Sequence, residues 1–293
     1  MRRILIVLLM LTAGVAHARI LHVGDNTIKL SQTKTTTPAL HVRVGDEVWY
    51  GMMVPIFVKN TLHVRYNNVE YSVLQCAPFT DTTNYTYDES GRLIGTNENI
   101  YLESTGTQWI DTGLYGNQDS SVKVSVQVYD NGNYHSQIFG SRKSYANRAF
   151  YFNGGYNDGQ HWFFNYGRTY NPQSTPYLND WQKHEIYFNK NKVYMDDELY
   201  WESSYTNEFE TPGTMRLFDC YNLDLSSNAG PLKGRIWYAM VWDDDTLVRH
   251  FVPVPCGLKI GDFVVPENGM WDIVEQKFYG NMGTGEFIYG VDE

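Results

Sequence analysis

Aromatic rings and planar polar side chains are concentrated in one stretch of the chain, residues 134–177. Sugar rings present apolar C–H faces, so a carbohydrate site needs an aromatic platform flanked by amide, guanidinium or carboxylate groups. The stretch contains both kinds of group around Gly-rich loops, and its candidate ligand-binding residues are Arg142, Trp162, Asn165, Arg168 and Tyr170. The structural alternative is that the Phe residues of this stretch fill a core while its Tyr residues cover strand edges.

We expect Trp162 or Tyr170 to stack on a sugar ring while the polar members of the set bond its hydroxyls. The segment "QHWFFNYG" makes this expectation specific, because Trp162 and Phe164 share one strand face and Phe163 occupies the other. Only one of these faces can be buried against a second sheet if the other lines a groove.

Two further patterns could hold a metal ion. The residues His22, His41 and His63 occupy the same position in three similar units, so stacked strands could bring their imidazoles together. Each of them alternates with Leu and Val, however, which favours a position on the solvent face. The run "WDDDT" at 242–246 could ligate Ca²⁺, although between two strand-like segments it is more typical of a hairpin tip. The sequence therefore assigns no metal or other cofactor.

The amino-acid composition of the chain is typical of β-sheet, so strands must position these residues. Aromatics make up 15% of the chain, Tyr outnumbers Phe by 23 to 14, and Ala is scarce after the first 18 residues. In "SSVKVSVQVY" four Val residues, 122, 124, 126 and 128, alternate with polar ones, which predicts a strand with one buried face. Similar short runs separated by Gly, Asn, Asp and Pro follow to the end, as in an antiparallel sandwich or barrel.

The N-terminus reads as a secretory signal peptide over residues 1–18, with Arg2 and Arg3, a short apolar run and Ala16-His17-Ala18. That run is too short for a membrane span, so we expect a secreted, periplasmic or cell-surface protein. Removing Arg2 and Arg3 from the 23 basic residues leaves 21 against 33 acidic ones, a net charge of −12. Nucleic acid and anionic membranes are therefore poor partners.

Three segments follow the signal peptide. Residues 40–51 and 62–72 are two copies of a strand, turn and return strand, and residues 21–30 form a degenerate third. Such short units cannot bury a face alone, so we expect one small sheet over 19–82. The polar, turn-rich stretch 83–98 reads as a connector, and the larger domain covers 99–293. The residues Cys76, Cys220 and Cys256 are odd in number, so at least one thiol is free or pairs between chains.

Residues 99–290 resemble the laminin G-like, concanavalin A-like jelly-roll domains of exported bacterial and phage-associated proteins. The resemblance rests on the first hairpin, "STGTQ" at 104–108, the Val-alternating strand, "LVRHFVPV" at 247–254 and the closing "GTG" at 283–285. It implies an all-β fold in which a concanavalin A-like jelly-roll sandwich follows a small antiparallel β-hairpin-repeat region. It implies function only loosely, because such sandwiches host lectins, adhesion modules and glycosidases.

Laminarinase-type glycosidases of this superfamily carry the strand motif Glu-x-Asp-x-Glu, which pairs an acid with a nucleophile. The nearest match is "MWDIVE", where Asp272 and Glu275 fit the second half but Met270 stands at the nucleophile position. The pair Glu208 and Glu210 lacks a third carboxylate and runs into a proline. The sequence therefore predicts a carbohydrate-binding or surface-adhesion module without catalytic activity, whose partner is a glycan or cell-surface polysaccharide. The alternatives are a glycoside hydrolase or lyase and a purely structural envelope protein.

Overall fold

The computed structural model describes residues 19–292 without the segments 24–25, 31–38, 45–46, 53–60, 67–68, 75, 77, 130–134, 145–146, 155–161, 174–179 and 225–228. Of residues 19–75 and of a few later strand positions it describes the backbone alone. The predicted signal peptide lies outside the described residues. Every regular element within them is a β-strand, which confirms the all-β class, and none is a helix that could cross a membrane.

The chain divides into two compact units, Met1–Cys76 and Ala77–Glu293. The first contains the repeated hairpins: β1 (Arg19–Val23) with β2 (Asn26–Leu30), β3 (Ala39–Val44) with β4 (Glu47–Met52), and β5 (Thr61–Tyr66) with β6 (Val69–Leu74). We expected these copies to join into one sheet. Within the described backbone the ladder bonds lie between the two strands of each hairpin and β2 lies beside β3, and the single sheet over 19–82 stays a prediction.

The second unit is built on two large sheets, named here after their central strands. The β12 sheet has the order β10 (Ile110–Asn117), β19 (Glu210–Leu217), β12 (His135–Arg142), β13 (Ala149–Asn153), β14 (Trp162–Gly167) and β15 (Thr169–Gln173). The short strands β20 (Tyr221–Asn222) and β21 (Ala229–Pro231) pair with β12 in parallel, whereas the order above is antiparallel throughout.

The β11 sheet has the order β18 (Glu198–Glu202), β17 (Lys192–Met195), β16 (Lys183–Asn189), β11 (Ser120–Val128), β22 (Lys233–Asp243), β23 (Thr246–Val254), β26 (Gly269–Asp272) and β27 (Lys277–Tyr279). One end of β22 also pairs with β9 (Ile100–Thr105), which in turn pairs with β28 (Ile288–Val291). All of these pairings are antiparallel.

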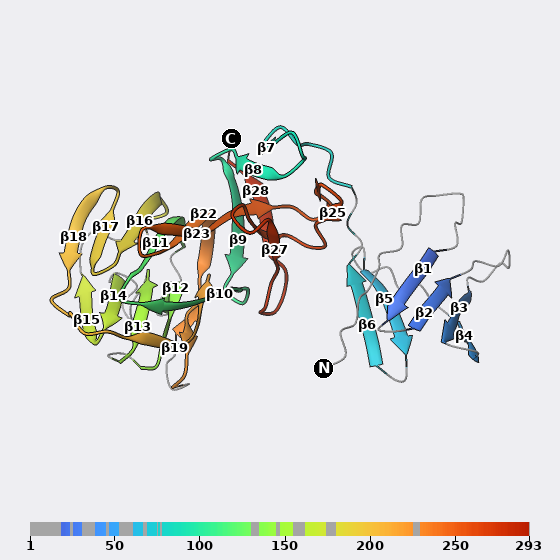
Figure 1. The fold of residues 1–293 in the computed structure, drawn as a ribbon, viewed down its shortest axis with the longest axis horizontal. Helices are drawn as coiled ribbons and strands as arrows, with labels where there is room; N and C mark the ends of the chain where they lie inside the picture. The colour runs from blue at the N-terminus through green and yellow to red at the C-terminus, as the bar shows by residue number, and fades with distance from the viewer. Residues whose placement is uncertain are drawn as a thin grey trace. The chain divides into compact units, whose positions relative to one another are not determined.

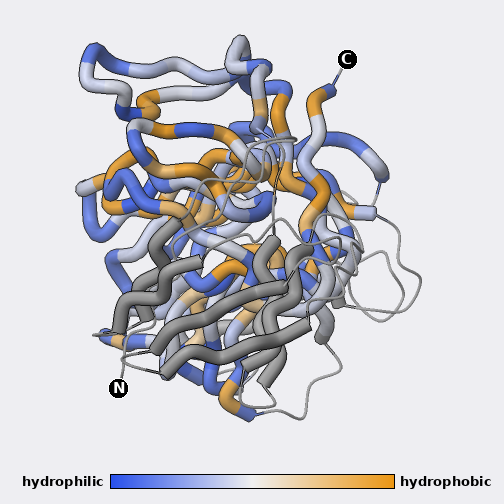
Figure 2. The backbone as a smooth tube through the Cα atoms, turned by 90° about the vertical axis from the view of Figure 1, so that its right-hand side faces the viewer, coloured by the Kyte–Doolittle hydropathy of each residue, from blue (hydrophilic) through white to orange (hydrophobic). Residues whose placement is uncertain are grey.

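The two sheets pack face to face over one aromatic and aliphatic core, so this unit is a β-sandwich (Figure 1). Across this core Phe150 of β13 stacks on Phe188 of β16, with ring centroids 4.5 Å apart and planes 17° apart. The predicted alternation in β11 is confirmed, since Val122, Val124, Val126 and Val128 are all buried in this core. Hydrophobic and hydrophilic positions alternate in short stretches along the described strands of the unit (Figure 2).

Residues 83–98, predicted to be a connector, instead form a hairpin that belongs to the second unit. It consists of β7 (Tyr85–Tyr87) and β8 (Leu93–Thr96). Tyr85 and Leu93 are buried in a second core cluster together with Ile100 and Trp271. A further small hairpin, β24 (Lys259–Ile260) with β25 (Phe263–Val264), contributes to the same cluster. Because two buried side chains are enough to dock an otherwise polar hairpin, composition alone misplaced this boundary.

We predict that residues 77–293 unfold cooperatively as an isolated fragment, whereas a fragment that begins at residue 99 is less stable. Removing Tyr85 and Leu93 uncovers apolar surface on Ile100 and Trp271, at a cost of about 3 kcal/mol or more. Urea denaturation of both fragments measures the difference. Equal midpoints and slopes for the two fragments would show that the β7–β8 hairpin adds nothing to the sandwich.

Candidate functional site

Two of the predicted ligand residues, Arg142 and Asn165, lie on the face of the β12 sheet that points away from the core. Asn165 is the register partner of Tyr151, whose neighbours along β13 are core residues, so the alternation of strand side chains turns both away from the core. Arg142 donates from Nη1 to the Tyr151 hydroxyl across 2.8 Å. All three side chains are fully buried. The structure thus brings two predicted residues to one face without exposing either.

The contact between Arg142 and Tyr151 offsets the cost of burying a cation. The guanidinium carbon lies 4.5 Å from the Tyr151 ring centroid, within cation–π distance. Gly140, opposite Tyr151 in the register, has φ +132°, and a Cβ there would come within 2.2 Å of the Tyr151 Cβ. Glycine is therefore required for the two strands to approach at this point. Ligand binding by Arg142 and Asn165 stays a prediction.

The expectation that Trp162 forms an exposed platform is wrong. Its side chain has no exposed surface, because β14 directs Trp162 and Phe164 into the core between the sheets. The indole stacks on Phe152 with ring centroids 5.2 Å apart and meets Tyr200 of β18 edge-on. Trp162 therefore joins the two sheets and has no face left for a sugar.

The remaining predicted residues lie at the β14–β15 turn. Arg168 is exposed between the two strands. The backbone of Tyr170 lies opposite Asn165 in the ladder, but its side chain is outside the described part of the structure. Binding by Arg168 and Tyr170 stays a prediction.

A free thiol is buried close to the same face of the β12 sheet. Among the cysteines, Cys220 is free, whereas Cys76 and Cys256 are disulfide-bonded. Burial raises the pKa of the Cys220 thiol above its ordinary value, which keeps the sulfur protonated. Its neighbour Asp219 accepts a hydrogen bond from Arg216 Nη1 at 2.6 Å. A buried, protonated thiol is a poor nucleophile, so this group has the character of a core residue.

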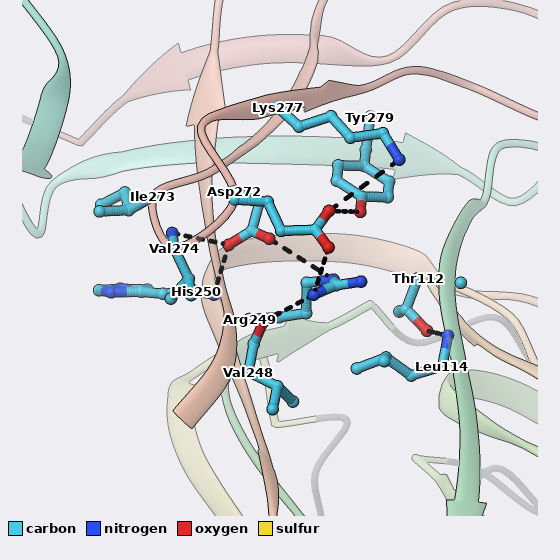
Figure 3. A network of polar contacts seen from close by, with 12 residues as sticks. Thr112, Leu114, Val248, Arg249, His250, Asp272, Ile273, Val274, Lys277 and Tyr279 are labelled. Carbon is cyan, nitrogen blue, oxygen red and sulfur yellow. Dashed lines mark hydrogen bonds and ion pairs between the residues drawn. The ribbon is translucent and has the colours of Figure 1, made fainter. Parts of the chain in front are cut away.

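Asp272, the centre of the partial glycosidase motif, is fully buried and anchors the backbone (Figure 3). Its Oδ1 accepts hydrogen bonds from the backbone N–H groups of His250 at 2.8 Å and Val274 at 3.0 Å. Its Oδ2 lies 3.5 Å from Arg249 Nε. These contacts tie β23 to the end of β26, which is a structural role.

Glu275, the other carboxylate of that motif, is bound within the same network. It forms an ion pair with Arg249 Nη1 and accepts a hydrogen bond from the Tyr279 hydroxyl, both at 2.8 Å. Burial, together with the hydrogen bond to Glu275, raises the pKa of Tyr279, so the phenol remains a donor. Arg249 therefore contacts both carboxylates of the motif and links them in one network.

The patterns considered for metal binding form no metal site in the described residues, where no group of three His, Cys, Asp or Glu side chains is placed to hold an ion. The run at 242–246 is a hairpin tip between β22 and β23, as the turn interpretation predicts. Asp244 in this tip pairs with Lys190 at 2.6 Å. The side chains of His22, His41 and His63 lie outside the described residues.

The opposite sheet presents a stronger candidate, which we call the β11 outer face. It comprises the side chains of β9, β11, β16, β17 and β22 that alternate with the core residues of those strands. Its aromatic and charged members, most of them partly exposed, are Tyr101, Glu103, Lys123, Lys183, Glu185, Tyr187, Tyr194, Arg235, Tyr238 and Trp242. Rings and charged groups are therefore interleaved across the middle of this sheet.

Trp181, just before β16, is the most exposed ring at this face, with 54% of its surface accessible. It stacks on Tyr129 with centroids 4.9 Å apart and planes 19° apart. The Gln127 side chain donates to the Trp181 carbonyl oxygen. The backbone of Trp181 has φ +64°, a conformation that is unfavourable for a bulky residue and often marks a functional position. The indole is therefore held open to solvent by specific contacts.

Hydrogen-bonding groups surround this stack. The Tyr129 hydroxyl donates to Glu103 Oε2 at 2.7 Å, and Arg235 Nε donates to the same oxygen at 2.8 Å. The guanidinium of Arg235 lies 4.0 Å from the Tyr101 ring centroid. Burial and the Glu103 carboxylate raise the pKa of Tyr129, so its hydroxyl stays protonated. We call Trp181, Tyr129, Arg235, Glu103 and Tyr101 the Trp181 platform.

His184 holds the turn that presents Trp181. Its Nδ1 lies 2.7 Å from Asp196 Oδ2, and its Nε2 lies 3.1 Å from Asp180 Oδ1. Asp180 also accepts from the backbone N–H of Gln182 at 2.8 Å, closing the turn around Trp181. Burial lowers the pKa of His184, but the hydrogen bonds and charges of Asp196 and Asp180 outweigh it and raise the pKa overall.

The Trp181 platform cannot be read from any one stretch of the sequence, because its residues come from distant segments. Trp181 lies in "NDWQK", which has no periodic pattern. The sequence of β9 does contain an indication of this surface, because Tyr101 and Glu103 alternate with the buried residues Ile100 and Leu102. Tyr101 and Glu103 therefore face outward, where the core does not need them.

Comparison with known proteins adds no relative: no family model and no curated protein matches this sequence.

Replacing the buried Trp162 and the exposed Trp181, one at a time, tests which of the two rings belongs to the core. Trp162→Ala removes a fully buried ring and should destabilise the protein by about 3–5 kcal/mol. Trp181→Ala removes a ring that is more than half exposed, so its effect should stay within about 1 kcal/mol. Chemical denaturation of both variants measures the difference, and a larger loss for Trp181→Ala would contradict the placement of the two rings.

The His184 contacts should make stability depend on pH. The pKa of His184 is higher in the folded state than in the unfolded state, where it is about 6.5. Protonated His184 therefore stabilises the fold fully below the unfolded pKa, and this stabilisation is lost as the pH rises through the folded pKa. The difference in unfolding free energy between the natural protein and His184→Gln should therefore shrink as the pH rises above about 6.5. We expect a change of at most about 1 kcal/mol, because both carboxylates are partly exposed. If the difference in unfolding free energy between the two proteins is the same at every pH, the raised pKa of His184 does not contribute to stability.

Proposed function

We propose that the protein is an exported carbohydrate-binding or surface-adhesion module without catalytic activity, built on a concanavalin A-like, laminin G-like jelly roll. Its partner is a glycan or cell-surface polysaccharide. The observation that carries the proposal is the exposed Trp181 ring, stacked on Tyr129 beside the Arg235–Glu103 pair. Export follows from the predicted signal peptide.

The chemistry of the Trp181 platform suits a sugar. An open indole face packs against the C–H groups of a pyranose ring, and its fixed orientation lowers the entropy lost on binding. Arg235 and Glu103 are only partly buried, so a donor and an acceptor stand at the edge of the ring for hydroxyls. Nucleic-acid bases use a similar combination, but the acidic net charge of the chain makes nucleic acid a poor partner.

A glycoside hydrolase or lyase is the rival function, and the Asp272–Glu275 network argues against it. Asp272 is buried on two backbone N–H groups, and Glu275 is paired with Arg249. Neither carboxyl group is placed to give a proton to a glycosidic oxygen. A purely structural envelope protein would have no need for an exposed indole in a left-handed backbone conformation.

The test is a glycan array probed with the mature chain, residues 19–293, and with Trp181→Ala. We expect binding to at least one glycan, reduced about tenfold or more in the variant, with an unchanged melting temperature. Tyr115→Ala on β10 is the matched control, since Tyr115 is 51% exposed but lies on the β12 sheet, and it should bind normally.

Two outcomes contradict the proposal. If Trp181→Ala binds glycan as well as the natural protein does, the Trp181 platform is not the binding site. If the natural protein releases reducing sugar from a bound polysaccharide and Asp272→Asn does not, the protein is a hydrolase.

A further inference from the structure

We propose that the β11 outer face binds a neutral, linear polysaccharide lengthwise along its strands, using two separate aromatic platforms, rather than a single terminal sugar. This inference rests on the proposed carbohydrate-binding function and specifies the class of glycan. It follows from a second aromatic cluster, from the register that separates the two clusters, and from the charge balance between them.

The second cluster, which we call the Trp242 platform, consists of Tyr187, Tyr194 and Trp242. The rings of Tyr187 and Tyr194 are register partners on β16 and β17 and stack with centroids 6.0 Å apart and planes 29° apart. The ring centroid of Trp242, on β22, lies 5.8 Å from that of Tyr187. All three side chains are partly exposed. A core does not require three large rings on the solvent side of a sheet, so a ligand surface accounts for them better.

The register sets the distance between the platforms. Gln127, which bonds the Trp181 carbonyl, is opposite Lys183, and Lys123 is opposite Tyr187. The two levels are four residues apart on both strands and point to the same side, which places them about 13 Å apart along the strand direction. One pyranose ring is too small to reach both platforms, whereas a chain of several linked sugars can lie across them.

The surface between the platforms is suited to hydroxyl groups. Ser125 occupies the middle level, between Glu185 on β16 and Tyr238 on β22. The Tyr238 hydroxyl donates to Glu185, and Lys123 Nζ lies 2.5 Å from the other oxygen of that carboxylate. Ser125 is small and buried at this level, so the groups that face a sugar chain there are the Tyr238 hydroxyl, Glu185 and Lys123, which can bond its hydroxyls.

The charges on this face cancel locally, which selects a neutral ligand. Lys123 is paired with Glu185, and Arg235 is paired with Glu103 and also lies 3.5 Å from Asp292. A polyanionic chain would have to compete with these carboxylates for the cations. A neutral chain needs only stacking and hydroxyl bonding, so its binding should depend little on ionic strength.

The experiment titrates the mature chain with β-1,3- and β-1,4-linked gluco- and manno-oligosaccharides, from the monosaccharide to the hexasaccharide, by calorimetry at low and high salt. The polymers themselves are tested by affinity electrophoresis. Trp181→Ala, Trp242→Ala and the double variant are compared with the Tyr115→Ala control, and melting temperatures confirm that each variant is folded. Tyr194→Ala is the substitute if Trp242→Ala fails to fold.

We expect affinity for one series to rise at least tenfold from the disaccharide to the hexasaccharide, with little change between the salt conditions. Each single variant should lose about tenfold for the hexasaccharide, and Trp242→Ala should lose little for the disaccharide. A monosaccharide that binds as tightly as the hexasaccharide, or a hexasaccharide affinity unchanged in both Trp242→Ala and Tyr194→Ala, overturns the lengthwise chain and leaves the proposed function standing. A glycan array on which nothing binds overturns the proposed function and the inference together.

Discussion

The sandwich depends on one constraint: each large sheet must bury one face in a shared core. The contact between Phe150 and Phe188 is where the two buried faces meet. Once β13 and β16 turn these rings inward, the period of two along a strand decides the direction of every other side chain in those strands. Tyr151 must then face away from the core on one sheet, and Glu185 and Tyr187 must do so on the other. The composition of the outer faces is therefore what remains free for function.

Much of the sandwich was predictable, because in β11 the buried Val residues alternate with Lys, Ser and Gln. The prediction failed where both kinds of position carry rings. In β14, Trp162, Phe164 and Tyr166 all enter the core, and an isolated sequence does not say whether a Trp in such a run fills a core or faces a groove. Pairing decides this, and pairing is set by strands far away in the chain.

The candidate site was harder to predict for the same reason. The candidates read from the sequence were neighbours in one segment, and the buried pair of Arg142 and Tyr151 shows that nearby polar and aromatic residues can serve the packing of a sheet. The Trp181 platform instead draws Tyr101, Tyr129 and Arg235 from three separated segments, which only the register of β9, β11 and β22 brings together. Local composition therefore pointed to a different sheet from the one that carries the Trp181 platform.

The ion pairs of the β11 outer face explain how exposed rings can be kept in fixed positions. Arg235 contacts the Tyr101 ring while its charge is held by Glu103, and Lys183 lies 4.6 Å from the ring centroid of Trp237. At a surface such pairs contribute little to stability, but each fixes a side chain that would otherwise sample several rotamers. A ring that is already oriented loses less entropy when a ligand stacks on it, so contacts of small value to the fold can be of larger value to binding. If the proposed function holds, the interleaved rings and paired charges of this face preorganise it for a neutral ligand, a role that the core beneath does not require.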